Sequence, residues 1–170
     1  SKAIRRIQHP QAGICYTTEE QYQLEMSFYK EMTEYSKGAA VIATLDGTAK
    51  ASASYTLNPE QLNAFQFICR GSGNLALVNG APGTGKSYLL NAVREAYRLS
   101  GHTVIGCSLA ATAAEELQKS SAINSQTIDS LLIELDTGRK LLKKNSVIVV
   151  DEAGMVGVKK LKKLLDHAKR

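Results

Sequence analysis

The stretch GAPGTGKS, residues 80–87, decides the fold, because it fits the pattern G-x-x-x-x-G-K-[ST] at every fixed position. The apolar run NLALVNG before it (74–80) predicts a short strand, and the sequence after it predicts a helix over about 85–99. A glycine-rich turn between a strand and a helix suits phosphate, since backbone N–H groups and the positive helix N-terminus converge on an anion. The same turn without any ligand is the alternative, and the strand–loop–helix context argues against it.

Each residue type in this loop has its own chemical role. The glycines allow tight curvature and close approach of the backbone to phosphate. Lys86 brings a point charge to the β and γ phosphates, and Ser87 offers a hydroxyl to Mg²⁺. The predicted cofactors are therefore ATP and Mg²⁺, and the predicted nucleotide contacts are Gly80, Gly83, Thr84, Gly85, Lys86 and Ser87.

A pair of acidic residues, Asp151 and Glu152, follows the β-branched run at 147–150 and lies 65 residues after Lys86. That gap accommodates two βα crossovers, which can bring the end of this later strand beside the phosphate loop. Asp151 could then hold Mg²⁺ through its water shell, and Glu152 could orient or deprotonate the attacking water. Two exposed acids in a turn are the alternative, and the pairing with the phosphate loop favours function.

The rest of the chain predicts an α/β fold, a P-loop NTPase with a partial parallel sheet covered by helices. Further strands are expected within 102–109 and at 147–150, where the continuous β-branched run is typical of a strand buried on both faces. The remaining expected segments are helices over 17–37, 58–70, 113–119, 125–136 and 158–169, with a flexible linker at 46–56. We therefore divide the chain into a helical extension with linker (1–56) and an α/β domain that contains the phosphate loop (57–170).

Composition and charge exclude several classes of protein. With 170 residues, 44% of them apolar and 22% charged, the chain is an ordinary globular domain rather than a fibrous or disordered one. No run of apolar residues is long enough to cross a bilayer, and the start lacks a secretory signal, so we expect a cytoplasmic protein. The start also lacks an initiator Met, which suggests either a piece of a longer protein or the remnant of a tag. Three scattered cysteines predict neither a disulfide framework nor a zinc site.

The basic charge is concentrated near the end of the chain. Residues 139–170 carry ten basic and three acidic side chains, whereas the whole chain has a net charge of +5. A basic segment is a candidate contact for nucleic acid. The lysines of VKKLKKLLDHAK (158–169) alternate with apolar residues at helical spacing, however, and the solvated face of an amphipathic helix is the favoured interpretation.

Several motifs together resemble a known family. GAPGTGKS and VIVVDEAGMV look like motifs I and II of superfamily 1 helicases of the RecD-like branch, LNPEQLNAF resembles their upstream glutamine motif, and SLAATAAEEL with SQTIDSLL resembles motif Ia and the segment that adjoins it. Together with TTEEQYQLE near the start, the chain is most similar to the helicase region of Ti-type conjugative transfer relaxases (TraA-like), over most of residues 14–170.

The resemblance implies an ATP-dependent DNA helicase of conjugative plasmid transfer, in which residues 57–170 are the N-terminal part of a RecA-like domain. Its implied partners are single-stranded DNA, a second RecA-like domain and the relaxase domain of the parent chain. It gives Gln61 an adenine contact, although Asn58 and Gln61 also form a good helix capping box. The resemblance places DNA contacts at Ser108, Thr112 and Thr127. Two of them have an alternative interpretation, because Thr112 could form a capping box with Glu115 and Thr127 could simply begin its helix. Asp129 stands where the family often has His, which weakens this segment as a DNA contact.

Parts of the family pattern are missing from these 170 residues. There is no relaxase motif, so nicking is not expected here, and neither the strand with a G-D-x-x-Q motif nor the second domain with its arginine finger follows Glu152. An arginine finger contributes about 10³ to 10⁵ in rate, so we expect this chain alone to bind Mg·ATP and hydrolyse it very slowly. A different P-loop enzyme, such as a small-molecule kinase, and a non-catalytic nucleotide- or DNA-binding module remain the alternatives.

Overall fold

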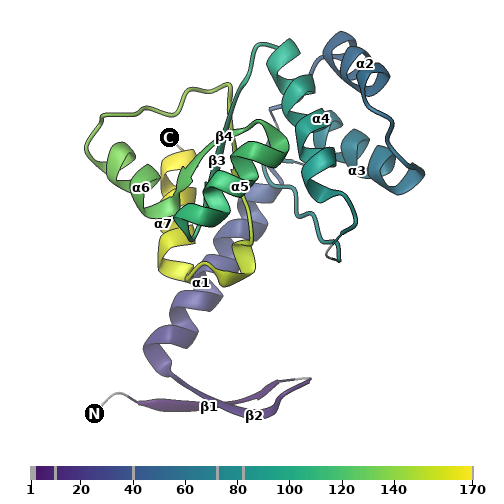
Figure 1. Cartoon of the computed structure of the whole chain (residues 1–170). Coiled ribbons are helices and arrows are strands. Elements are labelled where there is room, and N and C mark those ends of the chain that lie inside the picture. The colour runs from purple at the N-terminus through teal and green to yellow at the C-terminus, as the bar shows by residue number, and fades with distance from the viewer. Residues whose placement is uncertain (1–2, 10, 40, 72, 82, 170) are drawn as a thin grey trace.

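A three-stranded parallel sheet forms the centre of the computed structural model, which describes residues 3–9, 11–39, 41–71, 73–81 and 83–169 (Figure 1). The central strand β3 (Thr103–Ser108) pairs with β4 (Asn124–Thr127) on one side and with β5 (Ser146–Val150) on the other. Helix α5 (Ala111–Ser121) connects β3 to β4, and α6 (Ile128–Asp136) lies between β4 and β5. The predicted α/β class is confirmed.

Helices cover both faces of this sheet, as the β-branched strand predicted. Val104 and Val147 pack against the cluster that includes Phe65 and Val93, whereas Ile105 and Ile148 belong to a second cluster, with Ile128, Leu131 and Leu164. Neighbouring residues of a strand point to opposite faces, which accounts for this alternation. In Figure 1, α2, α3 and α4 lie on one side of the strands, with α6 and α7 (Val158–Ala168) on the other.

The helix before the phosphate loop and the helix after it form where the sequence predicted them. Helix α3 (Pro59–Arg70) begins with Pro59 after the capping box of Asn58 and Gln61, and ends at Gly71 in the left-handed conformation. Helix α4 (Lys86–Leu99) buries one side through Leu89, Val93, Ala96 and Tyr97. Burial raises the pKa of both Cys69, between these helices, and Cys107, on β3, to about 12, so both thiols act as small apolar side chains.

The prediction of a flexible linker at 46–56 was wrong, because helix α2 (Leu45–Ser54) occupies most of it. Thr44 caps this helix by accepting a hydrogen bond from the N–H of Gly47, and Ala51 is completely buried. A Cβ placed on Gly47 would lie 2.9 Å from the carbonyl oxygen of Ala96 in α4. The small residues that resembled a linker therefore serve close helix–helix packing. The division of the chain at residue 56 stays a prediction, but α2 packs with the second part.

The expected strand at 74–80 is also not present. The described residues of this segment adopt no regular secondary structure, with Leu77 79% and Val78 42% exposed. A strand exists only where a neighbour accepts its hydrogen bonds, and within the part of the chain that the structure describes no strand pairs with the outer edge of β5. Apolar composition was therefore insufficient, because pairing decides strand formation.

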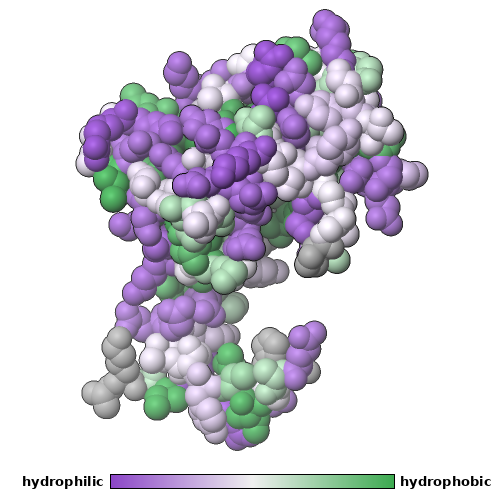
Figure 2. All heavy atoms as spheres, viewed as in Figure 1, coloured by the Kyte–Doolittle hydropathy of each residue, from purple (hydrophilic) through white to green (hydrophobic). Residues whose placement is uncertain are grey.

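The N-terminal part consists of a hairpin and a long helix. Strands β1 (Ile4–His9) and β2 (Gly13–Thr18) pair antiparallel, a hairpin that the sequence analysis did not predict. Helix α1 (Glu19–Ser36) follows within the predicted range 17–37, and Thr18 caps it by accepting a hydrogen bond from the N–H of Gln21. The hairpin projects away from the sheet (Figure 1), and Figure 2 shows hydrophobic residues gathered on it; Ile4, Ile14 and Tyr16 are exposed.

The second half of α1 packs against α7 and joins the extension to the rest of the protein. Glu31 accepts hydrogen bonds from Lys162 at 2.5 Å and from Lys169 at 3.1 Å, and the Tyr35 hydroxyl donates to the carbonyl oxygen of Ala168 at 3.3 Å. The lysines of α7 are therefore partly used inside the molecule, since Lys160 also pairs with Asp129 of α6 at 2.7 Å. This use supports the interpretation of α7 as an amphipathic helix.

Candidate nucleotide-binding site

The phosphate loop keeps an open, strongly curved backbone before α4. Gly83 and Gly85 have φ angles of +77° and +78°, in the left-handed region that glycine adopts without strain. Pro82 lies outside the described residues. Gly85 precedes the first helical residue, and no side chain of the described residues caps this end of α4. The N-terminus of α4, with its partial positive charge, is thus free of a competing side-chain acceptor.

Lys86 lies over the loop that precedes it. Its ammonium Nζ donates hydrogen bonds to the carbonyl oxygens of Gly80 at 2.7 Å and Ala81 at 2.9 Å. Among the described residues, no carboxylate lies within ion-pair distance of this ammonium. The charge is therefore held in place by neutral carbonyl groups, an arrangement that leaves it unneutralised and suited to an anion.

Thr84 stabilises the loop from within, and Gln61 does so from α3. The Thr84 hydroxyl donates to the carbonyl oxygen of Ala81 at 2.8 Å. The Gln61 amide Nε2 donates to the carbonyl oxygen of Thr84 at 3.1 Å, while its Oε1 accepts from the backbone N–H of Asn58. Gln61 therefore lies at the loop, and both halves of its amide make hydrogen bonds; the sequence pointed to Gln61 but not to its contact with the loop.

The two acidic residues follow β5 directly. The backbone N–H of Asp151 donates to the carbonyl oxygen of Cys107 at 2.9 Å and so extends the pairing of β5 with β3 by one residue. Its carboxylate Oδ1 accepts from the N–H of Glu152 at 3.0 Å. Glu152 is exposed and has φ +51° and ψ +41°, a left-handed conformation that costs a non-glycine residue about 1–2 kcal/mol. Such strain is often found at functional sites.

The sheet brings three of the predicted site residues to one edge. Ser108 is the partner of Thr127 in the register of β3 and β4, and Asp151 follows β5 at the same carboxyl end. In Figure 1 the loop before α4 and the turn after β5 both lie toward the lower side of this part of the molecule. The direct approach of the two carboxylates to Lys86 stays a prediction.

The residues predicted to contact DNA differ in how accessible they are. Ser108 is fully buried and its hydroxyl has no hydrogen-bond partner among the described residues, so it presents no surface to DNA in this structure. Thr112 is exposed in the first turn of α5, where no side chain forms the expected capping box with Glu115. Thr127 caps α6 by accepting from the N–H of Ser130 at 3.1 Å, as the alternative interpretation predicted. Contact of Thr112 and Thr127 with DNA stays a prediction.

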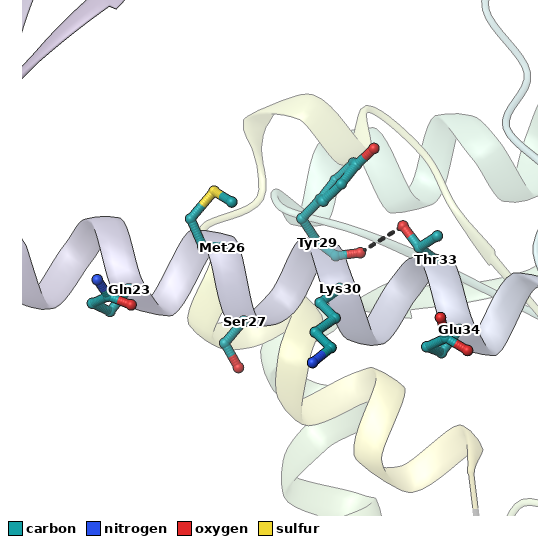
Figure 3. A pocket seen from close by; sticks show the side chains of 7 residues that line it. All are labelled: Gln23, Met26, Ser27, Tyr29, Lys30, Thr33 and Glu34. Atoms are coloured by element: carbon teal, nitrogen blue, oxygen red, sulfur yellow. Dashed lines mark hydrogen bonds between the residues drawn. The ribbon is translucent and has the colours of Figure 1, made fainter.

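A surface hollow elsewhere on the molecule offers no comparable chemistry. All seven side chains around it come from α1, and Figure 3 shows them fanned along one helix rather than converging; they are Gln23, Met26, Ser27, Tyr29, Lys30, Thr33 and Glu34. The hydrogen bond drawn there joins the Thr33 hydroxyl to the carbonyl oxygen of Tyr29, within the helix. The nucleotide site at the loop before α4 stays a prediction, and this hollow offers no rival to it.

Fold and loop define a P-loop protein, and the family comparison agrees. Residues 56–170, more than half of the chain, match the AAA domain family, and the protein belongs to this family. The match begins shortly before α3 and includes the phosphate loop, the three-stranded sheet and α7.

Three conjugal transfer proteins are similar to most of the chain. It is 35% identical over 158 residues to conjugal transfer protein TraA of Rhizobium radiobacter, and 33% identical over 156 residues to that of Agrobacterium fabrum; each alignment covers 91% of this chain. A probable TraA of Sinorhizobium fredii is 37% identical over 112 residues, 66% of this chain. The predicted resemblance to the TraA-like helicase region is thereby confirmed. The chain spans 10–14% of the length of these relatives.

No helix in the described part of the chain combines the length and the apolar character that crossing a membrane requires.

Proposed function

We propose that this chain forms the ATP-binding part of a motor that moves along single-stranded DNA and unwinds it during conjugative transfer, in the cytoplasm. The observation that carries the proposal is the uncapped helix start at Gly85 beside an ammonium, Lys86 Nζ, held by carbonyl groups alone. The similarity to conjugal transfer proteins supports the choice of DNA rather than a small molecule as the object of the motor.

The residues present fit a magnesium nucleotide. Three loop glycines leave the backbone bare, and apart from the chain neighbours of Gly83 no described atom lies within 4 Å of the place where its Cβ would stand. In the proposed role, backbone N–H groups of the loop and Lys86 bind the phosphates, while Ser87 and Asp151 hold Mg²⁺. Bound Mg²⁺ would offset charge on the phosphates. Glu152, on its exposed turn after β5, would orient the attacking water and accept its proton.

The end of the sheet supplies a place for the DNA in this proposal. Thr127 lies at the carboxyl end of β4, and Thr112 lies at the start of α5, just after β3. Both are at the same edge of the sheet as Asp151. Ligands of open parallel sheets bind beyond the carboxyl ends of the strands. In this proposal DNA binds at the carboxyl edge of the sheet and the nucleotide binds at the phosphate loop. The paired strands β3 and β5 would connect the two binding sites.

Titration of Mg·ATP with and without single-stranded DNA tests the proposal. We expect the 170-residue chain to bind Mg·ATP, and we expect nucleotide and DNA to change each other's affinity by the same factor, because coupling is reciprocal. DNA binding that weakens with salt but does not respond to ATP would instead favour a non-catalytic binding module. Binding of Mg·ATP without any affinity for DNA would favour another P-loop enzyme.

A further inference from the structure

The side chain of Gln61 connects α3 to the phosphate loop. It lies in the first turn of α3, and 23 residues separate it from Thr84, whose carbonyl oxygen accepts a hydrogen bond from its Nε2 at 3.1 Å. Its Oε1 accepts from the N–H of Asn58 at 3.1 Å, and the Asn58 side chain accepts in turn from the N–H of Gln61 at 2.8 Å. The amide is therefore oriented by a capping box, and its donor side faces the loop.

A second contact independently places this amide against the loop. A Cβ placed on Gly85 would lie 2.5 Å from Nε2 of Gln61, closer than real Cβ contacts. The φ of Gly85, +78°, favours glycine, and a Cβ at this position would push the end of the Gln61 side chain away from the loop. Thr84 and Gly85, adjacent in the loop and immediately before Lys86, both touch the same side-chain amide.

We infer that Gln61 is a positioning residue for the phosphate loop and that it promotes phosphate binding whether or not a base is present. The inference rests on the proposed function, in which this loop binds the phosphates. A loop already held in its binding conformation loses less conformational freedom on binding. If Gln61 only contacts adenine, its loss should weaken the binding of ATP alone. If Gln61 positions the loop, its loss should weaken the binding of every phosphate ligand.

Gln61→Glu tests this inference, because the carboxylate keeps an acceptor for the Asn58 N–H but replaces the donor to Thr84 with a charged oxygen. The ligands are Mg·ATP, Mg·GTP and magnesium tripolyphosphate, titrated into the 170-residue chain. We expect all three affinities to fall by a similar factor, about three- to tenfold for the loss of one partly exposed hydrogen bond. Gln66→Glu, which adds the same negative charge at an exposed position later in α3, is the control matched in charge, and Glu60→Gln is the control at the neighbouring position; both should leave all three affinities nearly unchanged.

Amide hydrogen exchange of the ligand-free protein provides a readout that does not depend on nucleotide. We expect faster exchange at residues 83–86 in Gln61→Glu than in the wild type or in Glu60→Gln. Asn58→Ala removes the side-chain cap of α3 but leaves the amide of Gln61. If Asn58→Ala changes the loop as much as Gln61→Glu does, the effect belongs to capping and the inference is overturned.

The binding series has its own contradicting outcome. A loss of ATP affinity with unchanged GTP and tripolyphosphate affinities would make Gln61 an adenine-reading residue only and would overturn the inference. A wild-type chain that binds none of the three ligands would contradict the proposed function instead. In that case exchange at 83–86 still decides whether Gln61 holds the loop.

Discussion

Glu31 of α1 accepts a hydrogen bond from Lys162 of α7 across 131 residues, and Lys169 donates to the other oxygen of the same carboxylate. These two lysines lower the pKa of Glu31 from 4.5 to about 2. Together with the Tyr35–Ala168 hydrogen bond, these two ion pairs help to attach the projecting N-terminal part to the rest of the protein. Both partners remain partly exposed, so salt should weaken the attachment.

The position of Glu31 predicts a pH-dependent contact between α1 and α7. Because the pKa is lowered in the folded protein, the stabilisation is complete above about pH 4.5 and is lost as the pH falls toward 2. Hydrogen exchange of α1 should therefore accelerate between pH 4.5 and 2 in the wild type. Glu31→Gln should show the faster exchange already at neutral pH and less change in that window.

Glu25→Gln is the control for this experiment, since Glu25 is exposed on the same helix and, among the residues that the structure describes, accepts a side-chain hydrogen bond from Gln21 of that helix alone. It should behave like the wild type. The contradicting outcome is an unchanged exchange rate. If α1 of the wild type exchanges equally fast at acid and at neutral pH, after correction for intrinsic rates, then Glu31 does not hold α1.

Two loop glycines predict different responses to the same substitution. Gly85→Ala introduces a strained φ and a Cβ 2.5 Å from Gln61, whereas Gly83→Ala introduces the strain alone, because nothing lies within 4 Å of its Cβ. We expect Gly85→Ala to weaken Mg·ATP binding more than Gly83→Ala does, as measured by calorimetric titration. Combining Gly85→Ala with Gln61→Ala should recover part of the loss, and strictly additive effects would exclude the steric contact.

Two substitutions of Glu152 should separate its effect on the stability of the protein from its proposed role in ATP hydrolysis. Asn tolerates the left-handed conformation better than Glu, so Glu152→Asn should stabilise the protein by up to about 1 kcal/mol, or about 2–4 °C in Tm. Glu152→Gln keeps the strain and should leave Tm unchanged. Both variants should retain Mg·ATP binding and lose hydrolysis in a chain that carries the whole motor. Hydrolysis that survives in Glu152→Gln would remove Glu152 from the role of base.

Replacing an alanine of α2 by leucine should affect the stability of the protein differently on the buried and the exposed face of this helix. Ala51 is completely buried against α4, and overpacking of such a site costs about 1–3 kcal/mol, so Ala51→Leu should lower the free energy of unfolding by that amount. Ala49→Leu adds the same atoms on the exposed face of α2 and should be nearly neutral. Urea denaturation followed by circular dichroism measures both, and equal stability of the two variants would mean that α2 does not pack on α4.

The sequence predicted the parts of the fold that depend on local signals. The limits of α3 followed from the capping box of Asn58 and Gln61 and from Gly71, and the strands β3 and β5 followed from their β-branched runs. The errors arise where a distant partner decides. Residues 46–56 form a helix because α4 accepts their small side chains, and 74–80 forms no strand because no described strand pairs with it.

The candidate site also divides into features that local sequence predicts and features that depend on distant elements. The G-x-x-x-x-G-K-[ST] pattern identified the loop and Lys86 without any structural information, because the residue types themselves carry the chemistry. The hydrogen bond from Gln61 to Thr84 and the burial of Ser108 could not be inferred, since both depend on how α3 and β3 lie against other elements. The structure thus adds the contacts that hold the loop rather than the loop itself.

Calorimetric titration of Mg·ATP into the wild type and Lys86→Ala tests the assignment of the loop most directly. Lys144→Ala, which removes one exposed positive charge elsewhere, is the control. We predict saturable binding to the wild type and to Lys144→Ala, weakened at least about tenfold by Lys86→Ala, because a hydrogen bond to a charged group contributes about 1.5–3 kcal/mol. Equal affinity of all three proteins, or no binding by the wild type, would contradict the account.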